Sequence, residues 1–177
     1  MVDPEKCGIT HYPADVLRKG AKPIEKIDDN IRQIAEKMID IMLENNGIGL
    51  AGTQAGVGLK IFVIALDGKR ESARVYINPK VTPSGKMSRM EEGCLSVPGV
   101  QTKVRRYEKC RVEATDLEGN KIDEQAEGLY ARCLQHENDH LNGVTIADKL
   151  GSAGRIAHRR TLKKLEEQYE KASKEGK

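Results

Sequence analysis

The sequence predicts an α+β fold in which antiparallel sheets surround a central helix bearing an HExxH motif, with a further helix at the C-terminus. Three observations predict this fold class. Apolar residues recur at helical spacing in two segments, one early and one late in the chain. Several stretches rich in β-branched residues lie between these segments, and turn residues separate neighbouring stretches. The last segment is strongly charged and again has helical spacing.

Length, charge and cysteine spacing exclude several classes of protein before any motif is considered. A length of 177 residues without repeats or low-complexity linkers indicates one domain. With 30 basic and 27 acidic residues the formal net charge is +3, which argues against a bulk nucleic-acid binder. The N-terminal stretch lacks the apolar core of a signal peptide, and no apolar run approaches membrane-spanning length. Four scattered cysteines fit reduced thiols, so we expect a cytoplasmic protein that binds neither a membrane nor a specific nucleic-acid sequence.

The first helix is predicted over about 28–46. Asp28 or Asp29 can cap its N-terminus, and Gly47 can end it. Its apolar residues share one face, which should pack on the core of the domain. This face is formed by Ile31, Ile34, Ala35, Met38, Ile41 and Met42.

Extended segments follow the first helix. Turn residues, including the sequence Glu118-Gly119-Asn120, separate them. The repeated strand–turn–strand spacing predicts antiparallel pairing. The predicted strands are 59–66, 73–79, 80–90, 103–116 and 121–128.

Residues 128–141 are predicted to form a helix that carries His136, Glu137 and His140. At about 100° per residue, the two histidines lie about 40° apart and one turn along the same face, with Glu137 on its flank. Two imidazoles can therefore bind one cation while the carboxylate reaches water bound to it. A surface helix with two histidines is the alternative. The flanking apolar residues favour a buried helix, in which these polar groups need partners.

Two histidines are too few ligands for a tight metal site, and four residues are candidates for the third ligand. His158 and Glu166 lie downstream, where a zinc protease would supply its third ligand. His11 lies in a predicted N-terminal loop, and Cys94 lies in a Gly-bounded turn between strands. The residues alone leave this choice open.

Three motifs follow one another along the chain: GIGLAGTQ at 47–54, EGCLS at 92–96 and QHENDH at 135–140. With these motifs and the opening ITHYPADVLRKGAKPI, the chain resembles peptide deformylases over roughly residues 8–150. The resemblance implies hydrolytic removal of the formyl group from the N-terminal formyl-methionine of nascent polypeptides. It also implies that the attacking water is activated by a metal, with Glu137 as general base.

The resemblance further assigns metal ligands and oxyanion donors. Cys94, His136 and His140 would hold one divalent metal ion per chain. That ion would be Fe(II) in the cell, with Zn(II), Ni(II) or Co(II) as alternatives in the isolated protein, because the ligand types do not select among them. The side-chain amide of Gln54 and the backbone N–H of Leu95 would stabilise the oxyanion.

Substrate binding is expected on both sides of the ligands. Arg132 and Cys133 lie on the helix arc that carries the histidines, although Arg132 could instead form a salt bridge and Cys133 could simply pack. On the opposite side, backbone groups of the first motif would pair with the substrate as an added strand. The predicted substrate-binding residues are Ile48, Gly49, Leu50, Gly93, Leu129, Arg132 and Cys133.

Two residues depart from the family pattern. Gly52 stands where alanine is usual, and the missing methyl group is expected to loosen the loop that carries Gln54. Gln101 stands where many relatives carry a basic residue near the exit of the peptide. The second departure leaves recognition of residues beyond methionine unassigned.

Buried charge is expected beside the metal ligands. Asp139 lies about 60° from His136 around the helix and is buried if that helix is central. Arg106, on the strand after the Cys94 turn, and Glu92 are its candidate partners. We expect Arg106 to bridge Glu92 and Asp139 and so to brace the segments that bear the ligands.

The chain is expected to consist of a catalytic metallohydrolase domain, 1–150, and a basic C-terminal helix with a polar tail, 151–177. From residue 149 onward, nine basic and four acidic residues give a net charge of +5. A solvated helix is the plain interpretation. Because the substrate of the family emerges from a ribosome, we expect this helix to bind weakly near the exit tunnel. Its apolar stripe, Ile156, Leu162 and Leu165, should dock on the domain.

Two other classes of function remain open from sequence. An HExxH metallopeptidase would take His158 or Glu166 as its third ligand and would leave Cys94 without a role. A catalytically silent, ribosome-associated metal-binding module would have no need of Glu137 or Gln54.

Overall fold

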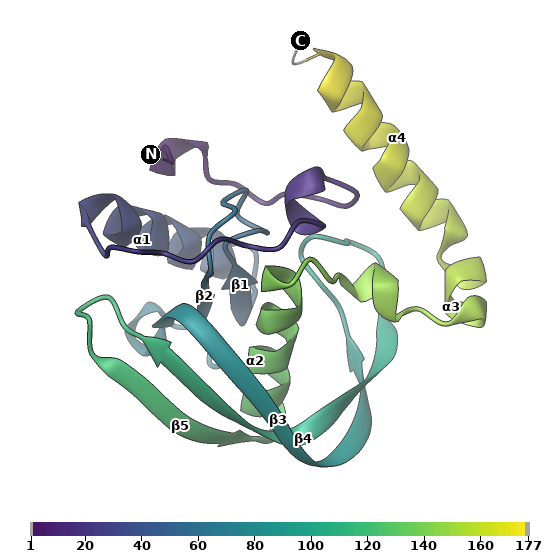
Figure 1. The fold of residues 1–177 in the computed structure, drawn as a ribbon. Coiled ribbons are helices and arrows are strands. Elements are labelled where there is room, and N and C mark those ends of the chain that lie inside the picture. The colour runs from purple at the N-terminus through teal and green to yellow at the C-terminus, as the bar shows by residue number, and fades with distance from the viewer. Residues whose placement is uncertain (1, 176–177) are drawn as a thin grey trace.

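A computed structural model describes residues 2–175 and confirms the predicted α+β class (Figure 1). The expected antiparallel strands form one sheet with the order β1-β2-β3-β4-β5, and α2 lies at the centre of the molecule. The strands are β1 (Gly49–Ala51), β2 (Ile61–Ile64), β3 (Arg74–Glu92), β4 (Thr102–Thr115) and β5 (Lys121–Glu127). The helices are α1 (Asp29–Glu44), α2 (Gly128–Leu141), α3 (Ser152–Ala157) and α4 (Arg159–Glu175). Short 3-10 helices are η1 (Pro4–Lys6), η2 (Asp15–Leu17), η3 (Arg70–Ser72) and η4 (Ile146–Lys149).

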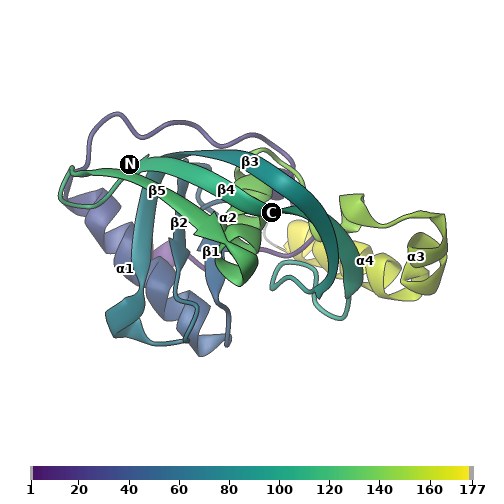
Figure 2. The same ribbon diagram turned by 90° about the horizontal axis from the view of Figure 1, so that it is seen from below.

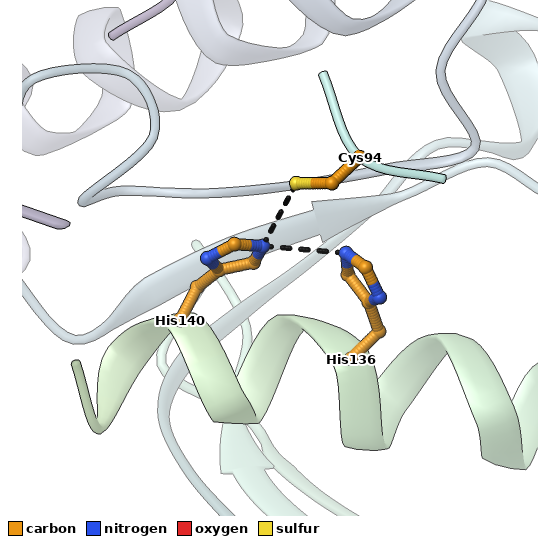
Figure 3. A group of neighbouring side chains, drawn as sticks. All are labelled: Cys94, His136 and His140. Atoms are coloured by element: carbon orange, nitrogen blue, oxygen red, sulfur yellow. Dashed lines mark hydrogen bonds between the residues drawn. The ribbon is translucent and has the colours of Figure 1, made fainter. Parts of the chain in front are cut away.

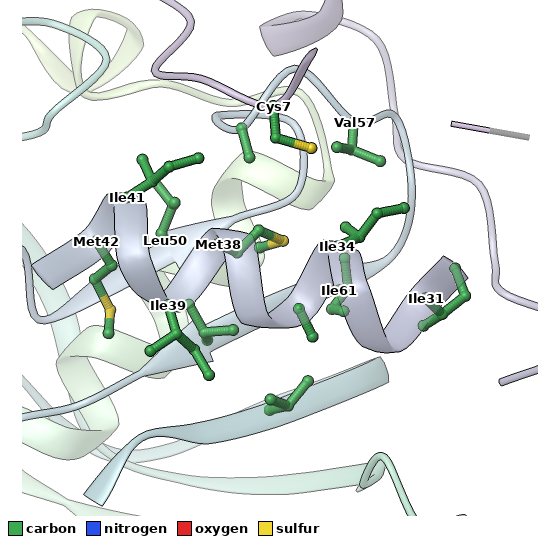
Figure 4. Packing of buried hydrophobic residues seen from close by; sticks show 14 of the residues in the cluster. Cys7, Ile31, Ile34, Met38, Ile39, Ile41, Met42, Leu50, Val57 and Ile61 are labelled. Atoms are coloured by element: carbon green, nitrogen blue, oxygen red, sulfur yellow. The ribbon is translucent and has the colours of Figure 1, made fainter. Parts of the chain in front are cut away.

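Helix α1 forms as its sequence predicts. The side chain of Asp28 accepts a hydrogen bond from the Ile31 N–H at 3.0 Å, which satisfies one of the free donors at the helix start. All six predicted apolar residues are buried, together with Ile39. They pack against β1, β2 and the N-terminal segment (Figure 4). At roughly 1.5–3 kcal/mol for each large apolar side chain, this burial fixes the helix that leads into the first motif.

Strands β3 and β4 form a long curved ladder beside α2. The two strands predicted at 73–79 and 80–90 are one strand, β3, of 19 residues. Its register with β4 shifts between Ile77 and Lys80 and again between Ser84 and Met87. Such bulges bend a strand and increase its twist, and the ladder curls around α2 (Figure 2). Glu92, at the end of β3, lies against His136 of α2.

Strand β1 was not predicted, because three residues containing a glycine give no strand signal. It pairs with β2 and ends the sheet, so one of its edges carries no neighbouring strand. Gly49 in β1 lies against Glu137 and Cys133 of α2. The unpaired edge therefore runs beside the helix that carries HExxH.

The C-terminal segment is helical but broken at His158 into α3 and α4. Leu165 is buried and Leu162 half-buried, in a cluster that includes Val97 and Val100. The prediction that Ile156 docks on the domain is wrong, because α3 turns outward and leaves this side chain 77% exposed. In Figure 1, α4 extends away from the sheet toward the C-terminus.

Two further expectations concern the whole chain. Within residues 2–175, none of the helices has the length and apolar character needed to cross a membrane. The last two residues of the predicted polar tail, 176–177, lie outside the described residues.

Candidate active site

The three residues expected to bind a metal lie together (Figure 3). Helix α2 presents His136 and His140 on one side, and Cys94 approaches them from the loop that follows β3. The Cys94 Sγ and the His136 Nε2 atoms each lie 3.2 Å from the His140 Nε2 atom. Ligand atoms of a tetrahedral ion, with bonds of about 2.0–2.3 Å, are separated by roughly 3.4–3.6 Å. The spacing of the three donors therefore fits one metal ion.

The electrostatics of these ligands also fit a cation. His136 Nδ1 donates to Glu92 Oε2 at 3.0 Å, which leaves the Nε2 lone pair directed toward the other ligands. Burial lowers the pKa of His136, but hydrogen bonds with Cys94 and Glu92 outweigh burial and raise the pKa to about 10. The position thus attracts positive charge. Burial lowers the pKa of His140 well below its usual value and favours the neutral, ligating form.

The other three candidates for the third ligand do not join this group of donor atoms. His158 Nε2 donates to the Gln101 carbonyl at 3.0 Å, and Glu166 accepts from the Tyr12 hydroxyl at 3.1 Å. His11 is exposed. Within the part of the chain that the structure describes, only Cys94 joins the two histidines in a group of three donors. The geometry therefore favours Cys94 among the four candidates for the third ligand.

A buried ionic network supports His136. Arg106 donates twice to Glu92, at 2.8 and 2.9 Å, and once to Asp139, at 2.8 Å, so the predicted bridge is confirmed. Arg132 adds a bond to Glu92 at 2.6 Å. Burial alone would raise the pKa of Glu92, but hydrogen bonds from His136 and Arg106 outweigh burial and lower it to about 2. Glu92 is therefore a fixed anion that orients the His136 ring.

Glu137 lies beside the ligands without joining them. Its side chain is 3% exposed, and its Oε2 atom has no hydrogen-bond partner within residues 2–175. Burial raises the pKa of Glu137 to about 7. A Cβ atom at Gly49 would overlap Glu137 Oε1 and lie 2.9 Å from Cys133 Sγ, so only glycine lets β1 approach the carboxylate this closely. The result is an unpaired carboxylate facing the ligands, suited to proton transfer.

Comparison with known proteins decides the family. The family model described as polypeptide deformylase matches residues 6–155 of the chain. The chain belongs to the peptide deformylase family. A peptide deformylase of Pseudomonas aeruginosa is 45% identical over 162 residues, which cover 91% of this chain and 95% of that protein.

Solved structures of peptide deformylases share the fold. The chain is 40% identical to a peptide deformylase from Legionella pneumophila, with a TM-score of 0.86 and coverage of 92% of this chain and 96% of that chain. It is 34% identical to a peptide deformylase from Plasmodium falciparum, with a TM-score of 0.87 and the same two coverages. Fold and sequence thus agree over nearly the whole length of these relatives.

The residues that resemble oxyanion donors of the deformylase family lie beside Cys94. Gln54 is almost fully buried, and its Oε1 accepts from the Ala51 N–H at 2.8 Å. Its Nε2 donates to Cys94 Sγ at 3.3 Å. Leu95 follows Cys94 directly and lines the same cleft. The amide of Gln54 is therefore held with its donor end toward the ligands.

The prediction that Gly52 loosens this loop is wrong. A Cβ atom at Gly52 would lie 2.7 Å from the Leu59 carbonyl oxygen and 3.1 Å from that of Val57. The Gly52 N–H donates to Ile61 at 2.8 Å, and its carbonyl accepts from Val57 at 2.8 Å. The returning backbone thus fills the space of the missing methyl group. The sequence could not show this, because the filling atoms are carbonyl oxygens whose position depends on the fold.

Cys94, His136 and Glu137 line one cleft of about 700 Å³, and His140 lies buried behind them. Leu50 is fully buried in the core and does not line it, which leaves only its backbone for the predicted pairing with substrate. Six of the seven predicted substrate-binding residues line the cleft: Ile48, Gly49, Gly93, Leu129, Arg132 and Cys133. Lining residues that the sequence analysis did not assign to substrate include Met90, Glu91, Gly99, Val100, Gln101 and His158.

The buried network predicts a large loss of stability when Arg106 is replaced by alanine. The side chains of Arg106 and Glu92 are only 6% and 8% exposed, so the change leaves Glu92 without two hydrogen bonds from a cation. We expect a fall of about 3–5 kcal/mol in the free energy of unfolding, measured by urea denaturation. Arg111→Ala is the matched control. Arg111 lies on β4, as Arg106 does, but its side chain is exposed and pairs with Asp123 of β5. Equal stability of the two variants would contradict the network.

Proposed function

We propose that the chain hydrolyses the formyl group from the N-terminal formyl-methionine of nascent polypeptides. One observation carries the proposal: Cys94 lies against both histidines of HExxH and lines a cleft with His136, in a chain of the peptide deformylase family. A metallopeptidase that used His158 or Glu166 would have no such thiol beside its histidines. The group formed by Cys94, His136 and His140 would hold one divalent ion.

The chemistry divides between the ion and the side chains of the cleft. When bound, a divalent metal would supply Lewis-acid activation of water and of the formyl oxygen. Glu137 would accept a proton from the attacking water and deliver it to the nitrogen of the methionine. The carbon–nitrogen bond of the formamide breaks, and the products are formate and a free N-terminal amine. The position of Glu137, buried beside the ligands yet unpaired, supports this role.

Charge that develops on the formyl oxygen needs donors fixed in advance. We assign the amide of Gln54 and the backbone N–H of Leu95 to this task. Gln54 is held through its oxygen by Ala51, so the amide needs little reorganisation to meet an oxyanion. Each such donor contributes roughly 10²–10³ in rate in comparable hydrolases.

The peptide would bind along β1. The unpaired edge of this strand can add the substrate as a further antiparallel strand, with Ile48 and Gly49 at the cleft. Leu129 and Cys133 are proposed to contact the methionine side chain from α2. Arg132 is engaged with Glu92, Ser88 and Val104, so its proposed contact with substrate is secondary to its role in the network.

The activity is tested with formyl-Met-Ala-Ser and its acetylated analogue, after anaerobic loading with Fe(II). We expect release of formate from the first peptide and no hydrolysis of the second, because the proposed activity is specific for the formyl group. Cleavage within the peptide would indicate a metallopeptidase. Metal binding without hydrolysis would indicate a silent module.

We further propose that Fe(II) is the ion in the cell, with Zn(II), Ni(II) or Co(II) as replacements in isolated protein. One thiolate and two imidazoles suit all four ions, so the support comes from the family resemblance. Elemental analysis of protein purified without oxygen tests the assignment, and a thiolate beside Fe(II) should make the activity sensitive to oxidation. We also propose a cytoplasmic location.

Residues 1–150 are proposed to form the catalytic unit, and the C-terminal helix to dock weakly on the ribosome. The basic residues Arg159, Arg160, Lys163 and Lys164 are exposed on α4, which extends from the body of the molecule. Such side chains gain affinity for phosphate-rich surfaces by releasing counterions.

Ribosome binding is tested by replacing these four residues of α4 with alanine in the full-length chain. This change is preferable to truncation after Leu150, because Leu165 is part of a buried cluster. We expect reduced co-sedimentation with ribosomes at low salt and a weaker dependence on salt concentration. The matched control removes four exposed basic residues of β4, namely Lys103, Arg105, Lys109 and Arg111. Equal co-sedimentation of the two variants would show that the basic residues of α4 do not bind the ribosome and that α4 is an ordinary solvent-exposed helix.

A further inference from the structure

We propose that His158 forms the outer end of the substrate cleft and accepts a hydrogen bond from the peptide backbone beyond formyl-methionine. The proposal rests on the proposed deformylase activity and concerns its selectivity for longer peptides. His158 comes from the junction of α3 and α4, outside all three sequence motifs of the site. It is therefore a contribution of the C-terminal segment to the cleft.

The hydrogen bond to Gln101 determines which ring nitrogen of His158 can accept a hydrogen bond from a substrate. Its Nε2 lies 3.0 Å from the Gln101 carbonyl oxygen. Because a carbonyl can only accept, Nε2 carries the proton, and Nδ1 of the neutral ring is an acceptor. The ring is half-buried and lines the cleft together with Gln101 and Gly99. A backbone N–H is a donor that every non-proline peptide residue supplies.

The α3–α4 junction is held firmly enough to form a binding element. The Tyr12 hydroxyl donates to Glu166 at 3.1 Å, about two turns into α4. Leu165 is buried against the cluster that includes Val97 and Val100, in the loop that also carries Gln101. The loop and the helix junction therefore support each other, as a precise contact requires.

The cleft has a buried end at Glu137 and an exposed end at His158, so His158 would contact the peptide downstream of methionine and not the formyl group. Glu137 and Cys133 are 3% and 5% exposed, whereas Gly99 and Gln101 are exposed. A long polypeptide must leave from the exposed side. At the roughly 30 Å³ that a water molecule occupies, a cleft of ~700 Å³ holds about twenty non-hydrogen atoms, roughly twice those of a formyl-methionyl residue. The cleft thus has room for downstream residues at its outer end.

The experiment compares kcat/KM for formyl-Met-Ala-dimethylamide, which has no N–H beyond its second residue, and formyl-Met-Ala-Ser-Ala-Ala-amide, using the metal-loaded full-length protein. One neutral hydrogen bond is worth about five-fold. We expect the wild-type protein to prefer the longer peptide by about this factor, mainly through KM, and His158→Ala to lose the preference. Arg155→Ala, an exposed change one turn earlier that does not line the cleft, should keep the wild-type ratio.

N-methylation identifies the donor. Methylating the third or the fourth residue's amide of the longer peptide should remove the preference in the wild-type protein and have no further effect in His158→Ala. An equal loss on both peptides in His158→Ala would show that the residue only braces the loop and would overturn the proposal. A preference that persists in His158→Ala would overturn it as well.

The proposal can be separated from the deformylase assignment. If the wild-type protein hydrolyses neither peptide, the proposed function fails. The affinities of the corresponding peptides without formyl groups, measured by calorimetry, then test His158 alone. A preference for the longer peptide that disappears in His158→Ala supports the subsite, and equal affinities of both lengths for the wild-type protein overturn it.

Discussion

Replacement of Cys94 by alanine should abolish metal retention and, with it, the hydrolysis of formyl peptides. Two imidazoles alone hold a divalent ion weakly, because structural and catalytic sites in proteins use at least three protein ligands. The Cys94 thiol lies 3.2 Å from His140 Nε2 and, as a metal-bound thiolate, would supply the third donor and a negative charge. Metal content after dialysis, measured by elemental analysis, should fall from about one ion per chain to nearly none.

Two variants control this experiment. Cys133→Ala removes another thiol that lines the cleft but does not belong to the group of donors, so it should keep the ion. His158→Ala removes the ligand that a peptidase would use and should also keep it, because His158 is bonded to Gln101. Loss of the ion from His158→Ala with retention in Cys94→Ala would favour the peptidase alternative.

Replacement of Glu137 by glutamine should leave the metal in place and lower kcat by roughly 10²–10⁴-fold, the usual contribution of a general acid–base residue. Glutamine has nearly the same shape as glutamate and fits the space left by Gly49, but it cannot accept the proton of the attacking water. Because the carboxylate is not a ligand, metal content should match that of the wild-type protein.

The control for Glu137→Gln is Glu108→Gln, on the exposed surface of β4 and outside the cleft. It makes the same chemical change and should retain wild-type kcat. An active Glu137→Gln enzyme would remove Glu137 from the mechanism, whereas loss of the metal in this variant would mean that the carboxylate supports the ion directly.

Local patterns made the helices and the metal-binding helix predictable. The apolar spacing and the Asp28 cap of α1 depend on residues three or four positions apart, and so does the pair of histidines in α2. The bridge from Arg106 to Glu92 and Asp139 could be anticipated because helix geometry placed Asp139 about 60° from His136, where it is only 24% exposed.

Features that depend on how the backbone folds back on itself were not predictable. The loop at Gly52 is tight because carbonyl groups of Val57 and Leu59 return over it. Arg132 donates to Glu92 and Ser88, some forty positions away in the sequence, because the curved strand β3 passes beside α2. The break at His158, which brings that ring to the cleft, has no local signal such as a proline. In each case the deciding contact comes from the fold and not from neighbouring residues.

We propose that one thiolate and two imidazoles form the metal centre of this deformylase-family chain. X-ray absorption spectroscopy of the full-length protein, loaded anaerobically with Fe(II) or Zn(II), measures the ligand set directly. We expect one sulfur at about 2.3 Å, from Cys94, and two imidazole nitrogens, at about 2.0–2.1 Å for zinc, with the sulfur signal absent from Cys94→Ala. A first shell of nitrogen and oxygen alone in the wild-type protein would contradict it.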